Sequence, residues 1–449
     1  MTAPGIPDLT GATVSLIALA IFVIAYGFVI AEEFTSLRKS KPVIIAAGAI
    51  WVLVGIAYAQ VGRADAGEAL KHQMAEYAEL LLFLLAAMTY VNTMQERLVF
   101  SALRSWMVAR RMSYRMIFWV TGLAAFSLSS SLDNLTTALV MGAVVVSVGR
   151  DNPRFLVPAC VNVVVAANAG GAFCPFGDIT TLMVWQAGVV KFFEFFDLFV
   201  PSLVNWLVPA LCMQFAIARG VPDAEKTRVQ VKPGGFAVIG LFALTIAMTV
   251  AMHQYLHLPP FVGMMTGMGL LMVYGYFIRR QELSVETSDV EIVAPAGLKS
   301  AHRPFDVFIS AKRVEWDTLL FFYGVILCVG GLGALGYLSL LSQASYISLG
   351  ATTANVLVGL ASAIVDNIPI MFAVLSMNPE MSHGQWLLVT LTAGVGGSLL
   401  SIGSAAGVAL MGQARGVYTF MAHLKWIWAI ALGYVASIWV HFLLNARLF

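Results

Sequence analysis

The stretch Ser129–Val140, SSSLDNLTTALV, places an acid, an amide and two threonines between two apolar runs of the chain. Each flanking run has about 13 residues, or roughly 20 Å of helix, which is short of the ~30 Å hydrocarbon core of a bilayer. A second apolar stretch, 350–377, is interrupted in the same way by VDNIP. We therefore predict two re-entrant hairpins, 116–148 and 350–377, each of which enters and leaves the membrane on one side.

The composition indicates an all-α polytopic membrane protein. Of 449 residues, 59% are hydrophobic and only 11% are charged, more apolar surface than a soluble domain needs. Apart from the two hairpins, apolar runs predict ten full spans, at 12–31, 42–61, 76–94, 155–190, 198–218, 235–253, 260–278, 316–338, 385–412 and 426–446. The four cysteines fall in apolar segments, so we expect them to pack rather than to bind a metal. We expect no cofactor, no enzymatic activity and no nucleic-acid partner.

The distribution of positive charge supports re-entrant hairpins. Cytoplasmic loops of membrane proteins are enriched in Lys and Arg. With both hairpins re-entrant and the N-terminus outside, the outer loops hold few of the 26 basic residues, namely Arg63, Lys71, Lys191 and Arg447. The predicted topology has both termini outside, a cytoplasmic loop at 220–234 and a cytoplasmic linker at 279–313. Hairpins that crossed the membrane fully would instead move Arg150 and Arg154 outside.

Three pairs of motifs repeat in the same order along the chain. EYAELLLFL at Glu76 resembles EWDTLLFFY at Glu315, SLDNLTT at Ser131 resembles IVDNIPI at Ile364, and GGAFCPFG at Gly170 resembles GGSLLSIG at Gly396. The offsets are 239, 233 and 226 residues. We therefore predict two repeats, 1–219 and 235–449, each with five spans and one hairpin. Because they start on opposite sides of the membrane they are inverted repeats, an architecture typical of transporters.

Irregular backbone at membrane depth is tolerated only where it is buried or lines a wet cavity. The sequence places it at the two hairpin tips and in two broken spans, NAGGAFCPFGDITT (168–181) and GVGGSLLSIGSAAG (394–407). Asp133, Asp178 and Asp366 lie there, each at a cost of roughly 2.5–3.5 kcal/mol on insertion scales. No basic residue lies in the interrupted segments to pair with these acids.

Oxygen ligands without basic partners favour a small hard cation or a proton. A carboxylate that holds either H⁺ or Na⁺, but not both, gives exchange by competition. We expect Na⁺ at five residues: Asp133, Asn134, Asp178, Asp366 and Asn367. Around these the sequence suggests further ion or proton ligands: Thr136, Thr137, Asn168, Thr180, Thr181, Asp317, Ser362, Ser398, Ser401 and Ser404.

Each of these residues also has a purely structural interpretation. The acids could cap the helix that follows them, and the tip asparagines could only tie the tip to backbone. The threonines could bond their own helix carbonyls, and the serines of the second broken span could be small packing residues. Glu79 and Asp317, near the starts of corresponding spans, could be proton-relay acids or interface residues.

The motifs EYAELLLFLLAAMTY, SLDNLTTALVM, ANAGGAFCPFGDITT, SAIVDNIPI and GGSLLSIGSAAGVALMG closely resemble the NhaD family of sodium/proton antiporters, over roughly residues 70–420. Cys174 and Phe176 depart from the small or aliphatic residues expected there, but neither would supply an ion ligand. The resemblance implies Na⁺(Li⁺)/H⁺ exchange in pH and salt homeostasis, a homodimer, and a hairpin-bearing transport domain that moves against a scaffold. The positions that it implies as functional are Asp133, Asn134, Asn168, Asp178, Thr180, Thr181, Asp317, Ser362, Asp366, Asn367, Ser401 and Ser404.

We therefore expect an antiporter of the bacterial inner membrane, surrounded by lipid, that expels sodium by an elevator-like movement. The first alternative is a carrier for an anion or a neutral solute, such as a dicarboxylate or arsenite, on the same scaffold. The second is an intramembrane aspartyl protease with Asp133 and Asp178 as its acid pair. The third is a channel.

Overall fold

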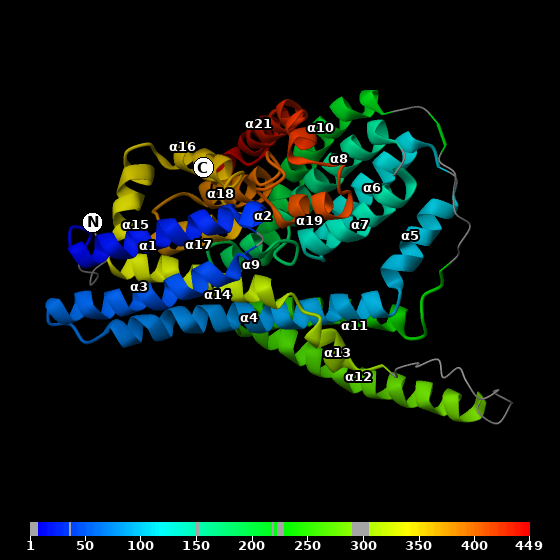
Figure 1. Ribbon diagram of the computed structural model, residues 1–449, viewed down its shortest axis with the longest axis horizontal. Helices are drawn as coiled ribbons and strands as arrows, with labels where there is room; N and C mark the ends of the chain where they lie inside the picture. Colours follow the sequence, from blue (N-terminus) through cyan, green and yellow to red (C-terminus); the bar gives the residue numbers. More distant parts are fainter. Residues whose placement is uncertain are drawn as a thin grey trace. The chain divides into compact units, whose positions relative to one another are not determined.

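The computed structural model describes residues 8–35, 37–110, 112–149, 152–217, 220–221, 229–289 and 305–449, which are helical with no strand among them (Figure 1). Nine helices of this part are long and apolar enough to cross a membrane, or ten if the pair Tyr337–Ile347 and Ala351–Ala361, bent by 116°, counts as one span. The chain is therefore an all-α, multi-pass membrane protein, as its composition predicts.

Contacts between residues divide the chain into two units. Unit 1 comprises Met1–Tyr77, Met107–Lys226 and Asp317–Phe449, and unit 2 comprises Ala78–Trp106 and Thr227–Trp316. The α-helices before residue 200 are α1 Thr13–Ile30, α2 Glu32–Thr35, α3 Ser40–Gln60, α4 Ala66–Glu96, α5 Val99–Ala109, α6 Tyr114–Ser129, α7 Asn134–Gly149, α8 Pro153–Gly171, α9 Ile179–Gln186 and α10 Phe199–Met213. The later ones are α11 Gly235–Leu256, α12 Pro260–Asp289, α13 Val307–Lys312, α14 Trp316–Ala334, α15 Tyr337–Ser342, α16 Ala351–Ala361, α17 Asn367–Met377, α18 His383–Gly396, α19 Ala405–Gln413, α20 Phe420–Leu424 and α21 Ile427–Leu444.

The predicted spans lie on these helices with shifted ends. Span 76–94 belongs to a helix that begins at Ala66, and span 260–278 to one that continues to Asp289. The cytoplasmic linker predicted at 279–313 is thus helical at both ends, while its residues 290–304 lie outside the described residues. The same holds for residues 222–228 of the loop predicted at 220–234.

Span 316–338 ends earlier than predicted, at Ala334. Gly336 has a φ of +100°, a left-handed conformation that favours glycine and ends the helix. The chain then forms α15, which overlaps the end of the predicted span, and a π-helical turn, Gln343–Ile347, within the predicted loop 339–349.

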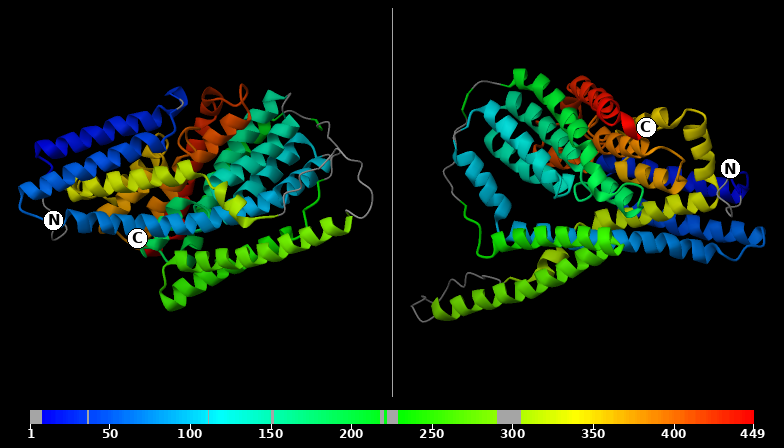
Figure 2. Two further views of the ribbon diagram at one scale, coloured as in Figure 1. Left: turned by 60° about the horizontal axis from the view of Figure 1, so that its bottom comes forward. Right: turned by 180° about the vertical axis from the view of Figure 1, so that it is seen from behind.

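In unit 2, α11 and α12 pack side by side, as all views show (Figure 2). Arg97, at the end of α4, is buried and bonds Glu282 Oε1 of α12 through Nη1 at 2.6 Å. Its guanidinium also lies 4.2 Å from the ring centroid of Phe305. A buried arginine with both an acid and an aromatic partner ties the end of α4 to α12 and to the segment before α13.

In unit 1, all four predicted interruptions are breaks between helices. The chain leaves helical geometry between α6 and α7, between α8 and α9, between α16 and α17, and between α18 and α19. Glycines make the close packing at these breaks possible. A Cβ on Gly170 would collide with the carbonyl oxygen of Phe126, and one on Gly396 would collide with that of Gly359.

Equivalent contacts recur at the offsets of the sequence repeats. Ser129 Oγ donates to the carbonyl oxygen of Ala167 at 2.6 Å, and Ser362 Oγ donates to that of Ala393 at 3.1 Å. Asp178 caps α9 with φ −144° and ψ 151°, and Ser404 caps α19 with φ −143° and ψ 149°. The two sets of broken helices in unit 1 therefore share one local backbone design.

We predict that Gly396→Ala lowers the free energy of unfolding by about 1–3 kcal/mol, because the new methyl group must push the backbone of Gly359 away. Thermal unfolding of the purified protein in detergent measures this. Gly48→Ala is the matched control, since a Cβ there meets no atom within 4 Å and alanine favours the helix α3. Equal melting temperatures for the two variants would contradict the packing role of Gly396.

Candidate ion-binding site

The candidate site lies within unit 1, where the four helix breaks meet. Asn134 and Asn367 are the first residues of α7 and α17, just after the two breaks that the sequence predicts to be hairpin tips. Asn168 lies in the last turn of α8, and Asp178 caps α9 after the break. Ser398 and Ser404 lie in the corresponding break between α18 and α19.

Asp178 is the centre of the polar contacts. Its Oδ2 accepts hydrogen bonds from Asn134 Nδ2 at 3.2 Å and from Asn367 Nδ2 at 3.1 Å, and its Oδ1 accepts from the backbone N–H of Thr180 at 3.2 Å. The residue is only 5% exposed. Both hairpin tips are thus joined through one carboxylate oxygen of a broken helix.

Asn168 extends these contacts to the second broken span. Its Oδ1 accepts from Asn134 Nδ2 at 3.1 Å, while its Nδ2 donates to Ser398 Oγ at 2.9 Å and to Ser404 Oγ at 3.0 Å. Asn168, Ser398 and Ser404 are buried. One side chain therefore links the first hairpin tip to both ends of the other break.

The charge of Asp178 is compensated by dipoles and neutral donors. Its partners in the described structure are two side-chain amides and one backbone N–H, with no basic side chain among them. The residue also caps α9, whose N-terminus carries a partial positive charge. A negative charge held by neutral groups leaves room for a cation or a proton to complete the balance.

Asp133 is turned toward its own helix. Its Oδ1 accepts from the backbone N–H of Thr136 at 2.8 Å, and its Oδ2 accepts from Thr136 Oγ1 at 2.7 Å. Both oxygens therefore cap α7, which is the structural interpretation of this acid. The cap also places Asn134, the next residue, against Asp178.

Asp366, the corresponding acid of the second tip, makes no side-chain cap. Its Oδ2 lies 3.1 Å from Nζ of Lys39, in the turn between α2 and α3. The interrupted segments contain no basic residue, and the basic partner of Asp366 is Lys39, which is 327 residues away in the sequence. This residue was missed because only tertiary contact brings it to the tip.

The remaining predicted residues fall into two groups. Thr181 Oγ1 donates to the backbone carbonyls of Asp178 and Cys174, at 2.7 and 2.9 Å, and Ser362 Oγ to those of Gly359 and Ala393. Ser401 Oγ lies 3.3 Å from Met411 Sδ. In contrast, the hydroxyls of Thr137 and Thr180 are buried with no hydrogen-bond partner in the described part of the chain, so they keep their capacity to bind an ion.

Neither Asp317 nor Glu79 takes part in the hydrogen bonds described around Asp178. Asp317, in the first turn of α14, accepts a 2.5 Å hydrogen bond at Oδ1 from Ser40 Oγ. Glu79 belongs to unit 2 and is half-buried. The structure therefore brings together Asn134, Asn168, Asp178, Asn367, Ser398 and Ser404 by direct side-chain contact, whereas Asp317 contacts the neighbouring turn at Ser40.

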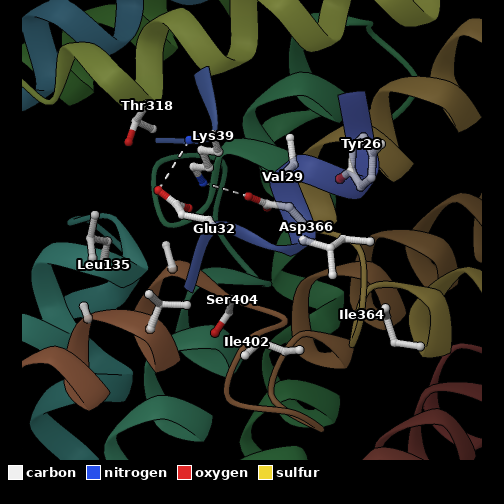
Figure 3. Close-up of a pocket in the computed structure, with 14 residues that line it drawn as sticks. Tyr26, Val29, Glu32, Lys39, Leu135, Thr318, Ile364, Asp366, Ile402 and Ser404 are labelled. Carbon is white, nitrogen blue, oxygen red and sulfur yellow. Dashed lines mark hydrogen bonds and ion pairs between the residues drawn. The ribbon is translucent and has the colours of Figure 1, made fainter. Parts of the chain in front are cut away.

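A cavity of about 270 Å³ opens beside this network. Its lining includes Asp366, Lys39, Ser404, Tyr26 and Glu32, which Figure 3 shows around one space. Ser404 borders the cavity and also holds Asn168. The cavity therefore reaches the hydrogen-bonded cluster from the side of the second hairpin tip.

Comparison with known proteins places the chain in a transporter family. The family model described as citrate transporter matches residues 9–394. The chain is 54% identical to the Na(+)/H(+) antiporter NhaD of Alkalimonas amylolytica, over 98% of this chain and 93% of that protein. It is 55% identical to the NhaD of Vibrio cholerae serotype O1, over 98% and 94% of the two chains.

A more distant relative, sodium/proton antiporter 1 of Arabidopsis thaliana, is 31% identical over 89% of this chain and 67% of its own length. Identity above one half across nearly the whole of two bacterial antiporters agrees with the motifs around Asp133, Asp178 and Asp366. The chain belongs to the NhaD family of Na⁺/H⁺ antiporters, within the broader group that the citrate transporter model describes.

Proposed function

We propose that this protein expels Na⁺, and also Li⁺, from a bacterial cell in exchange for H⁺ across the inner membrane. The observation that carries the proposal is the buried carboxylate of Asp178, held by one asparagine from each hairpin tip. The bacterial relatives, which are named Na⁺/H⁺ antiporters, support the same exchange.

The exchange follows from competition for one charge. A carboxylate in this buried place is costly unless a cation or a proton neutralises it. Carboxylate, amide and hydroxyl oxygens are suitable ligands for a small hard cation. Binding of Na⁺ at Asp178 excludes the proton, and binding of the proton excludes Na⁺. The site therefore crosses the membrane with Na⁺ bound in one direction and with H⁺ bound in the other.

We propose Na⁺ ligands at Asp178 and at the tip residues Asp133, Asn134, Asp366 and Asn367. Each oxygen of Asp133 accepts one hydrogen bond from Thr136 and would bind the ion through a remaining lone pair. The amides of Asn134 and Asn367 now donate to Asp178 Oδ2 through nitrogen. Their oxygens become ligands if the ion takes the place of these two hydrogen bonds. The hydroxyls of Thr137 and Thr180 would add neutral oxygens, since both are buried without a partner in the described structure.

For the architecture we propose inverted repeats at 1–219 and 235–449, joined by a cytoplasmic loop at 220–234, with re-entrant hairpins and both termini outside. The equivalent contacts of Ser129 and Ser362, and the equivalent caps of Asp178 and Ser404, support two repeats. In such transporters the site lies near the midplane between the repeats, and access alternates between the two sides. An elevator-like movement of the hairpin-bearing part and a homodimer complete the proposal.

The strongest alternative is a carrier for an anion such as a dicarboxylate. The description of the matching family model favours it, and so does the presence of Lys39 in the cavity. Against it, the partners of Asp178 are neutral donors, and a second negative charge there would meet no compensating cation among them. The protease alternative lacks support from geometry, because Asp133 bonds Thr136 whereas Asp178 bonds the tip asparagines.

We predict that Asp178→Asn abolishes Na⁺- and Li⁺-driven collapse of a pH gradient in everted vesicles, because the amide has nearly the same shape but no charge to exchange. The response should equal that of vesicles without the protein at every pH tested. Asp65→Asn, the same chemical change at a half-exposed acid paired with Arg63, should keep activity. Full activity of Asp178→Asn would contradict the proposal, and a response to citrate or succinate but not to Na⁺ would favour the anion carrier.

We predict that Asn168→Ala raises the apparent KM for Na⁺ about tenfold, a loss of roughly 1.4 kcal/mol in binding. The reason is that Asn134, Ser398 and Ser404 all lose the side chain that positions them. Initial rates against NaCl concentration in proteoliposomes measure the change.

Asn162→Ala on the same helix α8 is the matched control. Asn162 is also buried, but it bonds the Phe118 carbonyl and Trp206 rather than the site. This variant should lose stability and keep the wild-type KM. An unchanged KM in Asn168→Ala would argue against a positioning role for Asn168.

A further inference from the structure

The ion pair between Lys39 and Asp366 has no part in the exchange proposed above. Nζ of Lys39 lies 3.1 Å from Oδ2 of Asp366, and the two side chains are 20% and 18% exposed. We propose that Lys39 is a tethered competitor of Na⁺: its ammonium group occupies Asp366 while the tip holds no sodium, and it must leave before Asp366 can bind Na⁺. This inference rests on the proposed Na⁺/H⁺ exchange and adds a residue that sets the apparent affinity for sodium.

The turn that carries Lys39 is held in place from several sides. The backbone N–H of Lys39 donates to Glu32 Oε1 at 3.4 Å, and Figure 3 shows both residues beside Asp366. The Lys39 ammonium lies 4.4 Å from the ring centroid of Phe321. The next residue, Ser40, donates to Asp317 of α14. Lys39 is therefore positioned toward the second hairpin tip, and its ammonium contacts the aromatic ring at the same time as it pairs with the carboxylate.

The sequence explains why Asp366 needs an outside cation and Asp133 does not. Thr136 gives Asp133 two local donors, its backbone N–H and its hydroxyl. The offset of 233 residues that relates the tips puts Pro369 at the position of Thr136. Proline has neither group, and Asp366 accordingly makes no side-chain cap on α17. The carboxylate is left facing the cavity, where Lys39 binds it.

Lys39 and Na⁺ carry the same charge and need the same carboxylate oxygens. The cavity beside Asp366 has about 270 Å³ and is lined by further oxygens, of Glu32, Tyr26 and Ser404. Asn367, the next residue, bonds Asp178 directly. When Lys39 leaves Asp366, the change therefore occurs next to Asn367, which bonds the carboxylate of Asp178.

The competition has a defined effect on affinity. When a binding site is available only for a fraction of the time, the apparent dissociation constant of its ligand equals the intrinsic constant divided by that fraction. A partly exposed ion pair of ordinary strength would occupy Asp366 for most of the time, and removing it would lower the apparent KM for Na⁺ about threefold. A lysine that served only as a structural clamp would, when removed, lower stability or maximal rate without making Na⁺ bind more tightly.

The test compares Lys39→Gln, Lys39→Arg and Lys41→Gln in the full-length protein. Initial rates of Na⁺-driven proton movement are measured in proteoliposomes, with choline chloride keeping the ionic strength constant. We expect the KM for Na⁺ to fall about threefold in Lys39→Gln and to stay near the wild-type value in Lys39→Arg. Lys41→Gln removes the same charge two residues away, at an exposed position, and should leave KM unchanged.

An unchanged or raised KM in Lys39→Gln, with exchange by the wild type intact, would overturn this inference and leave the proposed function standing. No Na⁺-driven proton movement by the wild type at any pH would instead overturn the proposed function. If Lys39→Gln does not insert, Lys39→Met, which is uncharged and close to lysine in length, measures the same quantity with the same expected result. A KM that falls equally in Lys41→Gln would also refute the competition, because it would trace the effect to general surface charge.

Discussion

The candidate ion-binding site depends on the hydrogen bonds that Asp178 receives from the two tip asparagines, at 3.2 and 3.1 Å. A buried carboxylate is tolerated only when donors, dipoles or a cation compensate it. In this protein the compensation comes from backbone that has left helical geometry. The break after α8 aims Asp178 at the tips, while the tips place Asn134 and Asn367 at the start of α7 and α17. Each of these three helix breaks therefore places a polar side chain against a polar side chain from another break.

Glycines and small hydroxyl side chains allow neighbouring helices to pack closely at these breaks. Gly170 and Gly396 lie directly against carbonyl oxygens of α6 and α16, where no side chain fits. Ser129 and Ser362 bond equivalent carbonyls in the two halves of unit 1. Two copies of one backbone arrangement would give the two tip acids the same contacts, but Pro369 makes the contacts of Asp366 different. It deprives Asp366 of the cap that Thr136 gives Asp133, and the freed carboxylate turns to Lys39.

Much of this site could be predicted from the sequence, because its residues interrupt apolar runs. The polar tips and the glycine-rich breaks stand out against their surroundings, and their positions agree with the helix breaks of the structure. The residues predicted from the sequence include the whole set that meets around Asp178. Its connections were not predictable, since a pattern along the chain does not say which amide faces which carboxylate.

Features that depend on tertiary contact were missed or misplaced. Lys39 lies in an ordinary basic loop, and only the fold brings it to a tip 327 residues away. The extended ends of α4 and α12 were missed because polar residues near a helix end resemble a loop. The helix Tyr337–Ser342 was not predicted as a separate element, because it joins the end of the predicted span 316–338 to the start of the predicted loop 339–349. The orientation of the predicted repeats and the elevator movement depend on the membrane, and they stay predictions.

The central claim is that one carboxylate group binds either Na⁺ or H⁺, and linkage between the two ions tests it most directly. Purified protein in weakly buffered detergent solution would be titrated with NaCl, while a pH electrode or dye follows proton release and choline chloride serves as the control. The account predicts that Na⁺ binding releases protons, and that the release disappears at high pH, where the site is already deprotonated. Saturable Na⁺ binding without proton release at any pH would contradict it.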